Sequence, residues 1–537
     1  MTARSVSRRS LFALGGAAAI VTAGVGLPWG EDAQTKSASK LADKRMPRPY
    51  AQAFRRPPVL APRTVTTGAD GAPLRTYSLT ERAGTAEIAP GISTPVYGYN
   101  GSLPGPTVSL DAGTRSMLRV RNQLPAVHPS LGHDFHTSTH LHGSASKPQY
   151  DGYASDITPP GYYKDYYYPN FQAARTLWYH DHGVHYTAQN AYSGLAAQYH
   201  LHDEAERALL PQDEYDVPLT LSDVMFAADG ALAYDDNSHS GLWGDVILVN
   251  GVPWPVMKVK RRVYRFRVLN ASISRSYRPQ LSTGDPLTVV ATDGGLIPVA
   301  QQVLNYRHGN AERYEILIDF RRYKPGQRVE LRNLSNDNNR DYDHTGKIMA
   351  FDVTDEPILD TSRNTIPTLL VSSPVMALTA AQAKRTRKLR VERGNGEWQI
   401  NGKTWRDVVD SGYQMVLANP DYNDVEIWEI ENKSGGWFHP VHIHLVDFQI
   451  LSRNGKAPFA WEKGPKDVVY VGENEAVRLI MRFEHQRGKY MIHCHNLPHE
   501  DHDMMQQFSV GLAAGAPDPD DPINADPCRP DALGPDA

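Results

Sequence analysis

The chain has 537 residues, more than one hydrophobic core usually serves, so we expect about two to four domains. Its 56 basic and 60 acidic residues give a formal charge of −4, which excludes the strong basic excess typical of nucleic-acid binding and favours small-molecule partners. The 42 Gly, 39 Pro and 27 Tyr accompany many short runs of Val, Ile and Leu. This is typical of short strands joined by turns, so the predicted fold class is all-β.

The N-terminus has the features of an export signal. Residues 7–12 read SRRSLF, and residues 11–30 form an uncharged run rich in Ala and Gly. This pattern predicts the twin-arginine pathway, with its export machinery as a partner. A membrane anchor is the alternative, but the run is only weakly hydrophobic, so no stable membrane insertion is expected. We expect an exported protein that is extracellular, periplasmic or associated with the cell wall.

Three comparable strands recur along the chain, and each runs up to an Asn. They read SMLRVR at 116–121, YRFRVLN at 264–270 and VEIWEIEN at 425–432. This recurrence predicts three copies of one β-sandwich. The predicted segments are a signal at 1–30, an arm at 31–54, domains at 55–205, 210–355 and 385–512, a linker at 356–384 and a disordered tail at 513–537.

Pairs of His spaced two residues apart are unusually frequent. With 21 His in 537 residues, chance gives roughly 0.8 such pairs. Four pairs occur in HLHG at 140–143, WYHDHG at 178–183, HPVHIH at 439–444 and MIHCHN at 491–496. Two lie in the first predicted domain and two in the last, as expected if a metal cluster sits where these domains meet. We interpret a fifth pair, His200 and His202, as a surface strand end.

The last of these segments carries a thiol between its two His. Neighbouring side chains in a strand point to opposite faces, so His493 and His495 point one way and Cys494 the other. A thiolate, an imidazole at His499 and a thioether at Met504 form the soft ligand set of a blue electron-transfer copper. One short segment can therefore join two metal centres.

The chain has only two Cys, Cys494 and Cys528. A disulfide between them would consume the proposed ligand thiolate. Cys528 lies in the tail, which is rich in Pro, Asp and Ala, and we expect its thiol to be idle.

The four His segments resemble the copper-binding motifs of the multicopper oxidases, the family that contains laccases, ascorbate oxidase and bilirubin oxidase. The similarity spans residues 97–510. Within the family, the chain resembles the bilirubin oxidases and the bacterial spore-coat laccases. The strings that carry this are QYDG at 149–152, KDYYYPN at 164–170, WGDV at 243–246 and HEDHDMM at 499–505. The resemblance implies three cupredoxin-like Greek-key β-sandwich domains.

The resemblance also implies four copper ions per chain: one type 1, one type 2 and two type 3. The type 1 ion would bind His439, Cys494, His499 and Met504. The type 2 ion would bind His140 and His442. The type 3 pair would bind His142, His180, His182, His444, His493 and His495. No ligand is missing, which argues against a cupredoxin scaffold that has lost its copper.

Other residues of the motifs have roles implied by the same resemblance. Asp151 and Glu500 are similar to the acidic residues that deliver protons, although a turn and a solvated loop are the simpler interpretations. Trp437 is similar to a Trp beside the type 1 copper, where it eases electron entry, and packing is the alternative. Phe438 departs from the smaller residue expected there. Asp181 is expected to orient the His on either side of it.

The function implied is one-electron oxidation of phenolic, aminophenolic or bilirubin-like donors, coupled to four-electron reduction of O2 to water. The expected partners are thus a small aromatic reductant and O2. A cuprous or metal oxidase for copper tolerance is an alternative, but such enzymes often carry a Met-rich insert, and the 12 Met here form no such cluster. A copper-free scaffold is the third possibility.

Overall fold

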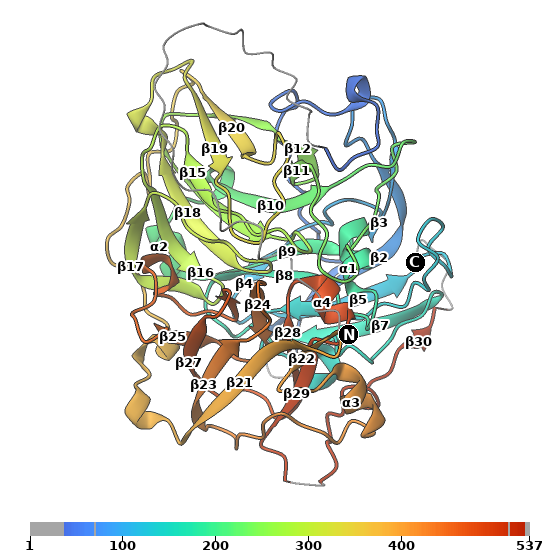
Figure 1. Cartoon of the computed structure of the whole chain (residues 1–537). Coiled ribbons are helices and arrows are strands. Elements are labelled where there is room, and N and C mark those ends of the chain that lie inside the picture. The colour runs from blue at the N-terminus through green and yellow to red at the C-terminus, as the bar shows by residue number, and fades with distance from the viewer. Residues whose placement is uncertain (1–36, 69–70, 514–515, 532–537) are drawn as a thin grey trace, which may run out of the picture. The chain divides into compact units, whose positions relative to one another are not determined.

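The structure, a computed structural model, describes residues 37–68, 71–513 and 516–531. These residues all belong to one compact unit. Figure 1 shows a chain built mainly of strands, coloured from blue through green to red. The signal expected at residues 1–30 lies outside the described residues. No helix among the described residues is long and apolar enough to span a membrane.

The first pair of sheets uses the strands before residue 203 and one late strand. The larger sheet has the order β1 (Thr64–Thr67), β2 (Pro73–Ala86), β5 (Arg115–Asn122), β7 (Tyr162–Tyr168) and β30 (Arg529–Pro530), with β3 (Thr94–Tyr99) paired to β2. The smaller has the order β4 (Val108–Asp111), β9 (Ala196–His202), β8 (Arg175–Asp181) and β6 (Thr139–His142). Helix α1 (Thr187–Ser193) connects β8 to β9.

The second pair of sheets follows α2 (Glu204–Leu209). Its larger sheet has the order β12 (Val252–Pro253), β11 (Val246–Val249), β10 (Asp216–Val224), β14 (Val263–Asn270), β18 (Arg313–Asp319), β16 (Leu287–Thr292) and β17 (Gly295–Val303). Its smaller sheet has the order β13 (Val256–Val259), β20 (Lys347–Val353), β19 (Arg328–Asn333) and β15 (Pro279–Leu281).

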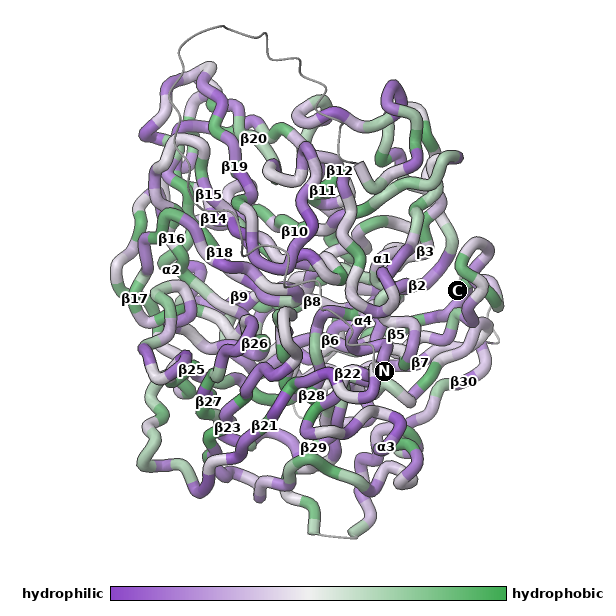
Figure 2. Tube along the Cα trace, in the orientation of Figure 1, coloured by the Kyte–Doolittle hydropathy of each residue, from purple (hydrophilic) through white to green (hydrophobic). Residues whose placement is uncertain are grey.

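The third pair of sheets carries two short helices, α3 (Trp405–Asp410) and α4 (Leu497–Asp501). One sheet has the order β22 (Glu397–Ile400), β21 (Arg385–Gly394), β23 (Val425–Asn432), β27 (Ala476–Arg482) and β25 (Phe448–Arg453). The other has the order β26 (Val468–Val471), β24 (His439–Ile443), β28 (Gly488–Cys494) and β29 (Met505–Val510). The strands are mostly short, and polar and apolar residues are mixed along them (Figure 2), so the prediction of a mainly β fold is correct.

The three similar strands occupy the same place in each pair of sheets. Strands β5, β14 and β23 each lie parallel to the first long strand of their sheet and antiparallel to a later strand. The Asn that ends each one is buried. Its side-chain amide donates to loop carbonyls: Asn122 to Phe135 and Thr158, Asn270 to Arg275 and His308, and Asn432 to Trp437 and Gly472. The recurring Asn therefore closes the same kind of loop three times.

Both ends of the described chain pack against sheets. In the arm, Ser39 donates to Asp245, and the Phe54 amide donates to the carbonyl of Val256. In the tail, β30 pairs with β7, and Asp526 accepts a hydrogen bond from Tyr150. The expectation of disorder is therefore wrong for residues 516–531. Composition misled us because these Asp side chains have partners on the first pair of sheets.

A buried ionic cluster joins the first and second pairs of sheets. Arg265 and Arg267 lie on β14, and both contact Glu315 of β18 and Glu206 of α2. Glu315 also accepts a hydrogen bond from Thr176 of β8 at 2.8 Å. Burial alone would raise the pKa of Glu315, but the two Arg outweigh it and lower the pKa to about 2. The cluster therefore holds full charges out of water, and each charge depends on its partners.

We expect Arg267→Met to lower the free energy of unfolding by about 3–5 kcal/mol, because it leaves buried carboxylates without their cation. Arg328→Met is the matched control, because its ion pair with Asp352 is exposed on both sides and is worth at most about 1 kcal/mol. Denaturant unfolding of the two variants measures this difference. Equal stability losses would contradict it.

Candidate metal centre

Cys494 and His493 stand at the end of β28 and face opposite ways. Strand β28 pairs with β24, so that Cys494 lies opposite Val441 and His493 opposite His442. Cys494 enters the apolar core of the third pair of sheets together with Met504. His493 instead lies against the rings of His442 and His444. The alternation along a strand thus separates a sulfur side from an imidazole side.

On the sulfur side, two imidazoles converge on the thiol. The distance from Cys494 Sγ is 3.3 Å to His439 Nδ1 and 3.7 Å to His499 Nδ1, and the two Nδ1 atoms are 3.2 Å apart. The outer nitrogens are already engaged: His439 Nε2 with the hydroxyl of Ser434, and His499 Nε2 with the carbonyl of Ser240. The Nδ1 atoms are therefore left to face the sulfur.

Helix α4 turns the chain back after β28, so that His499 lies beside Cys494 at the end of that strand. Asn496 precedes the helix, and Pro498 stands in its first turn, where its missing N–H costs nothing. After the helix, the Cys494 amide donates to the carbonyl of Met504 at 3.1 Å. Cys494, His499 and Met504 are fully buried, and burial raises the pKa of the thiol. Only a nearby cation can hold a thiolate here, as in a metal site.

On the imidazole side, eight buried His from the first and third pairs of sheets form one cluster. They are His140, His142, His180, His182, His442, His444, His493 and His495. Burial lowers the pKa of His180 to about 3 and that of His182 to about 4. Burial thus favours the neutral form of these two rings, in which one nitrogen keeps a free lone pair.

The first group of this cluster is His140 with His442. His140 Nδ1 donates to the carbonyl of Asp151 at 2.5 Å, and His442 Nδ1 donates to the carbonyl of Asp467 at 2.8 Å. Carbonyls only accept, so both protons lie on Nδ1. The two Nε2 atoms, 3.4 Å apart, then face each other with lone pairs only. Such an arrangement is repulsive unless a cation lies between them.

The second group has the same design with three rings. His444 Nδ1 lies 2.7 Å from Asp151 Oδ2, and His493 Nδ1 lies 2.8 Å from Glu500 Oε2. His493 Nε2 is 3.1 Å from the Nε2 atoms of both His444 and His182. Three imidazole nitrogens therefore converge on one point, which is the donor set of a metal ion.

The third group consists of nitrogens that have no partner. His142 Nδ1, His180 Nε2 and His495 Nε2 are buried and make no hydrogen bond. Their ring centroids lie 5.1 to 5.7 Å apart. A buried polar atom without a partner costs about 1–3 kcal/mol, so three together indicate a site for a cation. The described residues thus offer one group of donor atoms on the sulfur side and three on the imidazole side.

Asp151 and Glu500, both predicted from the sequence, contact the Nδ1 atoms of His in the cluster. Asp151 binds His140 through its carbonyl and His444 through its carboxylate. Burial raises its pKa well above the usual range. Glu500 lies 3.6 Å from His182 Nδ1 and 2.8 Å from His493 Nδ1. Burial alone would raise the pKa of Glu500, but His493 and His182 lower it to about 2. Both carboxyls thus lie beside the cluster rather than in a solvated loop.

The sequence analysis missed Asp467 and Arg313. His142 Nε2 lies 3.1 Å from Asp467 Oδ1, and Arg313 of β18 donates to the same oxygen at 2.7 Å. Arg313 is fully buried and comes from the second pair of sheets, which supplies none of the twelve proposed ligands. No His motif contains either residue, so only the structure could find them. Asp181, as expected, accepts from His180 through its carbonyl at 2.7 Å.

A second Trp was also missed at the sulfur side. Trp398 of β22 stacks on His499 with ring centroids 3.8 Å apart and is buried. Trp437 is partly exposed and lies edge-on to His499 at 5.9 Å. Phe438 is buried against Tyr470 and points away from this surface. Trp437 therefore lies where a donor can reach it, while Trp398 fixes the ring of His499.

The fifth His pair does not join the cluster. His200 Nε2 is 2.7 Å from Gln198 Oε1, and His202 Nδ1 is 3.4 Å from Glu206. His200 is buried, so the interpretation as a surface strand end was wrong. It packs beside the ionic cluster instead.

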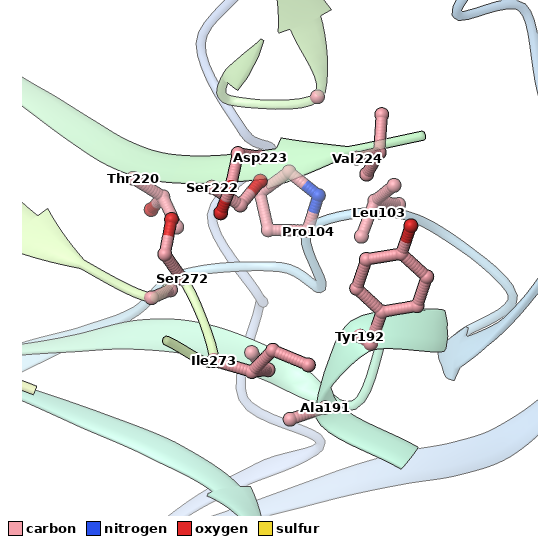
Figure 3. Close-up of a pocket in the computed structure, with 13 residues that line it drawn as sticks. Leu103, Pro104, Ala191, Tyr192, Thr220, Ser222, Asp223, Val224, Ser272 and Ile273 are labelled. Carbon is pink, nitrogen blue, oxygen red and sulfur yellow. The ribbon is translucent and has the colours of Figure 1, made fainter. Parts of the chain in front are cut away.

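A small cavity lies between β10 and α1. Tyr192, Asp223 and Ile273 are among the residues around it (Figure 3). Its volume of about 20 Å³ has room for about one water molecule. None of the His of the metal centre lines it, so it is no donor site.

Comparisons with known proteins agree with this geometry. Two family models, both described as multicopper oxidase, match residues 81–206 and 381–513. A bilirubin oxidase of Albifimbria verrucaria is 41% identical over 475 residues, which cover 84% of this chain and 80% of that protein. A laccase of Bacillus subtilis is 35% identical and covers 78% of this chain and 90% of its own.

Among solved structures, the McoA multicopper oxidase of Aquifex aeolicus has a TM-score of 0.75 and 29% identity over 86% of this chain and 99% of that chain. The similarity includes both regions that carry the His segments. Copper is the metal that this family implies, and the sulfur and imidazole donors suit it. The chain belongs to the multicopper oxidase family.

Proposed function

We propose that this copper-dependent oxidase takes its electrons from phenols, aminophenols or bilirubin-like tetrapyrroles. Members of the family named bilirubin oxidase and laccase are its relatives, so oxidation of a donor with O2 as acceptor is its reaction class. The observation that carries the proposal is the bond path through Cys494. Its side chain lies with His439 and His499, and its two chain neighbours lie in the imidazole cluster.

We propose four copper ions, held by the twelve side chains named in the sequence analysis. When bound, copper takes electrons from the donor one at a time and delivers four of them to O2, which becomes water. The protein holds the two centres a single residue apart along β28. Cys494 therefore offers a covalent route from the donor side to both His493 and His495.

Donor entry is proposed at the edge formed by Trp437, His439 and His499. Trp437 offers a partly exposed aromatic face beside His499. An aromatic donor can stack there by offset or edge contacts. Relatives named bilirubin oxidase and laccase support an aromatic donor over a metal ion.

Protons are proposed to reach the imidazole cluster through Asp151 and Glu500. Each carboxyl lies within hydrogen-bonding reach of a cluster His, at 2.7 Å and 2.8 Å. A carboxyl can hold or pass a proton only from such a position. One carboxyl has a raised pKa and the other a lowered pKa, so they suit different steps.

Export by the twin-arginine route remains a proposal based on residues 7–30. The sequence SRRSLF and the uncharged run after it support this proposal.

Cys494→Ser is expected to abolish the intense blue absorption and the oxidation of a dimethoxyphenol. Ser offers no soft thiolate, so the sulfur side loses its strongest ligand. Absorption spectra and oxygen uptake of copper-loaded protein measure both effects. Cys528→Ser is the control, because the Cys528 thiol donates to the carbonyl of Ile157 and contacts none of the proposed ligands, and it should keep both properties. A blue Cys494→Ser protein would refute the assignment.

Met504→Leu is expected to raise the type 1 reduction potential, because a weak axial thioether is replaced by a group that does not coordinate. Met505→Leu is a close control. Met505 is equally buried but packs with Met491 and Trp405 in another apolar cluster. Redox titration of the blue band should show the rise in the first variant alone. An unchanged or lower potential in Met504→Leu would count against an axial role.

Asp151→Asn is expected to lower turnover by about 10²- to 10⁴-fold while all coppers stay bound. The amide oxygen can still accept from His444, but the side chain can no longer hold or release a proton. Asp165→Asn is the control, because this carboxylate pairs with Arg119 and none of its contacts is a His. Full turnover in Asp151→Asn, with copper content confirmed by metal analysis, would end the relay proposal.

A further inference from the structure

A second group of His lies on the surface beside the sulfur side of the metal centre. The rings of His239 and His502 have centroids only 3.1 Å apart. Asp236 Oδ2 lies 2.9 Å from His239 Nδ1 and 3.8 Å from His502 Nε2. None of these three residues is among the twelve proposed copper ligands. All three are at least partly exposed, so an ion can reach them from solvent.

The distances suit a small metal ion. Ligand atoms around a tetrahedral ion with bonds of about 2.0–2.1 Å are separated by about 3.3–3.5 Å. The Asp236 oxygen lies 3.8 Å from His502 Nε2, near this value, and 2.9 Å from His239 Nδ1, a hydrogen bond that a bound ion would replace. Two imidazoles and one carboxylate form the borderline donor set that suits Zn²⁺ and Cu²⁺.

The loop that carries the cluster is held in one conformation. Asn237, Ser238 and His239 have left-handed φ angles of 51°, 55° and 65°. The Asp236 carbonyl accepts from the amides of Ser240 and Gly241 at 2.9 Å. A run of left-handed residues is costly and persists only where the surroundings hold it, so the backbone that carries Asp236 and His239 is fixed before any ion binds.

We propose that Asp236, His239 and His502 form a binding site for one divalent first-row transition-metal ion, outside the four-copper set. The site touches the metal centre through the backbone. Ser240, the next residue after His239, accepts from His499 Nε2 through its carbonyl at 3.1 Å, and His239 itself accepts from Trp398 Nε1 at 2.8 Å. Both contacts reach the ring of His499 or its stacking partner.

This geometry gives the ion an effect on the type 1 site, and this part rests on the proposed function. A cation at His239 withdraws electron density from the Ser240 carbonyl and, through its hydrogen bond, weakens electron donation by His499. It also places positive charge beside the site. Both effects favour the reduced form of the type 1 copper, so its reduction potential rises.

Zn²⁺ is the probe, because it is redox-silent and is distinguished from the resident copper by metal analysis. Copper-loaded protein is titrated with Zn²⁺ against a chromophoric chelator. We expect one tightly bound Zn²⁺. Losing a partner behind a ligand already weakens metal sites by about 10- to 100-fold, so His239→Asn and His502→Asn should each weaken binding by at least about 100-fold. His344→Asn, an exposed His on another loop, should bind as the unaltered protein does.

Equal Zn²⁺ affinity in the unaltered protein, His239→Asn and His502→Asn would overturn the site. Redox titration of the blue band with and without Zn²⁺ tests the coupling. The potential should rise in the unaltered protein and stay constant in His239→Asn, and a constant potential in both would overturn the coupling. Failure of the proposed function is distinguishable, because a protein without a blue band would still bind Zn²⁺ at this site.

Discussion

Buried imidazole nitrogens whose lone pairs face each other are the constraint on which the rest of the structure depends. His140 and His442 point unprotonated nitrogens at one another across 3.4 Å, and the Nε2 atoms of His444 and His493 lie 3.1 Å apart. Carbonyls behind His140 and His442 fix their tautomers by accepting hydrogen bonds from Nδ1. The protein therefore holds an arrangement that is unfavourable by itself and becomes favourable only with a cation in place. The contacts that orient the ligands therefore also favour the binding of a metal ion.

Asp467 and Arg313 show why three pairs of sheets are needed when only two supply ligands. Asp467 contacts His142 from the first pair and, through its carbonyl, His442 from the third. Arg313, from the second pair, forms an ion pair with Asp467 and so stabilises the charge of this buried carboxylate. All three pairs of sheets therefore contribute residues that position the His cluster. The middle pair of sheets contributes electrostatic support instead of coordination.

The sequence was most informative where spacing reflects strand geometry. The His pairs and Cys494 could be assigned because alternation along a strand fixes which side chains share a face, and the recurring Asn marked the repeated loop closure. Asp467, Arg313 and Trp398 could not be found this way, since their roles arise from tertiary contacts and leave no local pattern. The tail was misjudged for the same reason: its composition suggests disorder, but Asp526 has a partner at Tyr150 that only the fold reveals. His200 and His202 are the opposite case. They are spaced like the ligand pairs, but they lie outside the His cluster, and His200 is buried by packing.

The His of the cluster come from segments far apart in sequence, so the ribosome synthesises them at different times. The His of the first half are synthesised by residue 182, but their partners at residues 442–495 emerge some three hundred residues later. A growing chain therefore exposes half of a metal site with no means of completing it. The groups of donor atoms described above are therefore complete only once residues 439–504 have been synthesised.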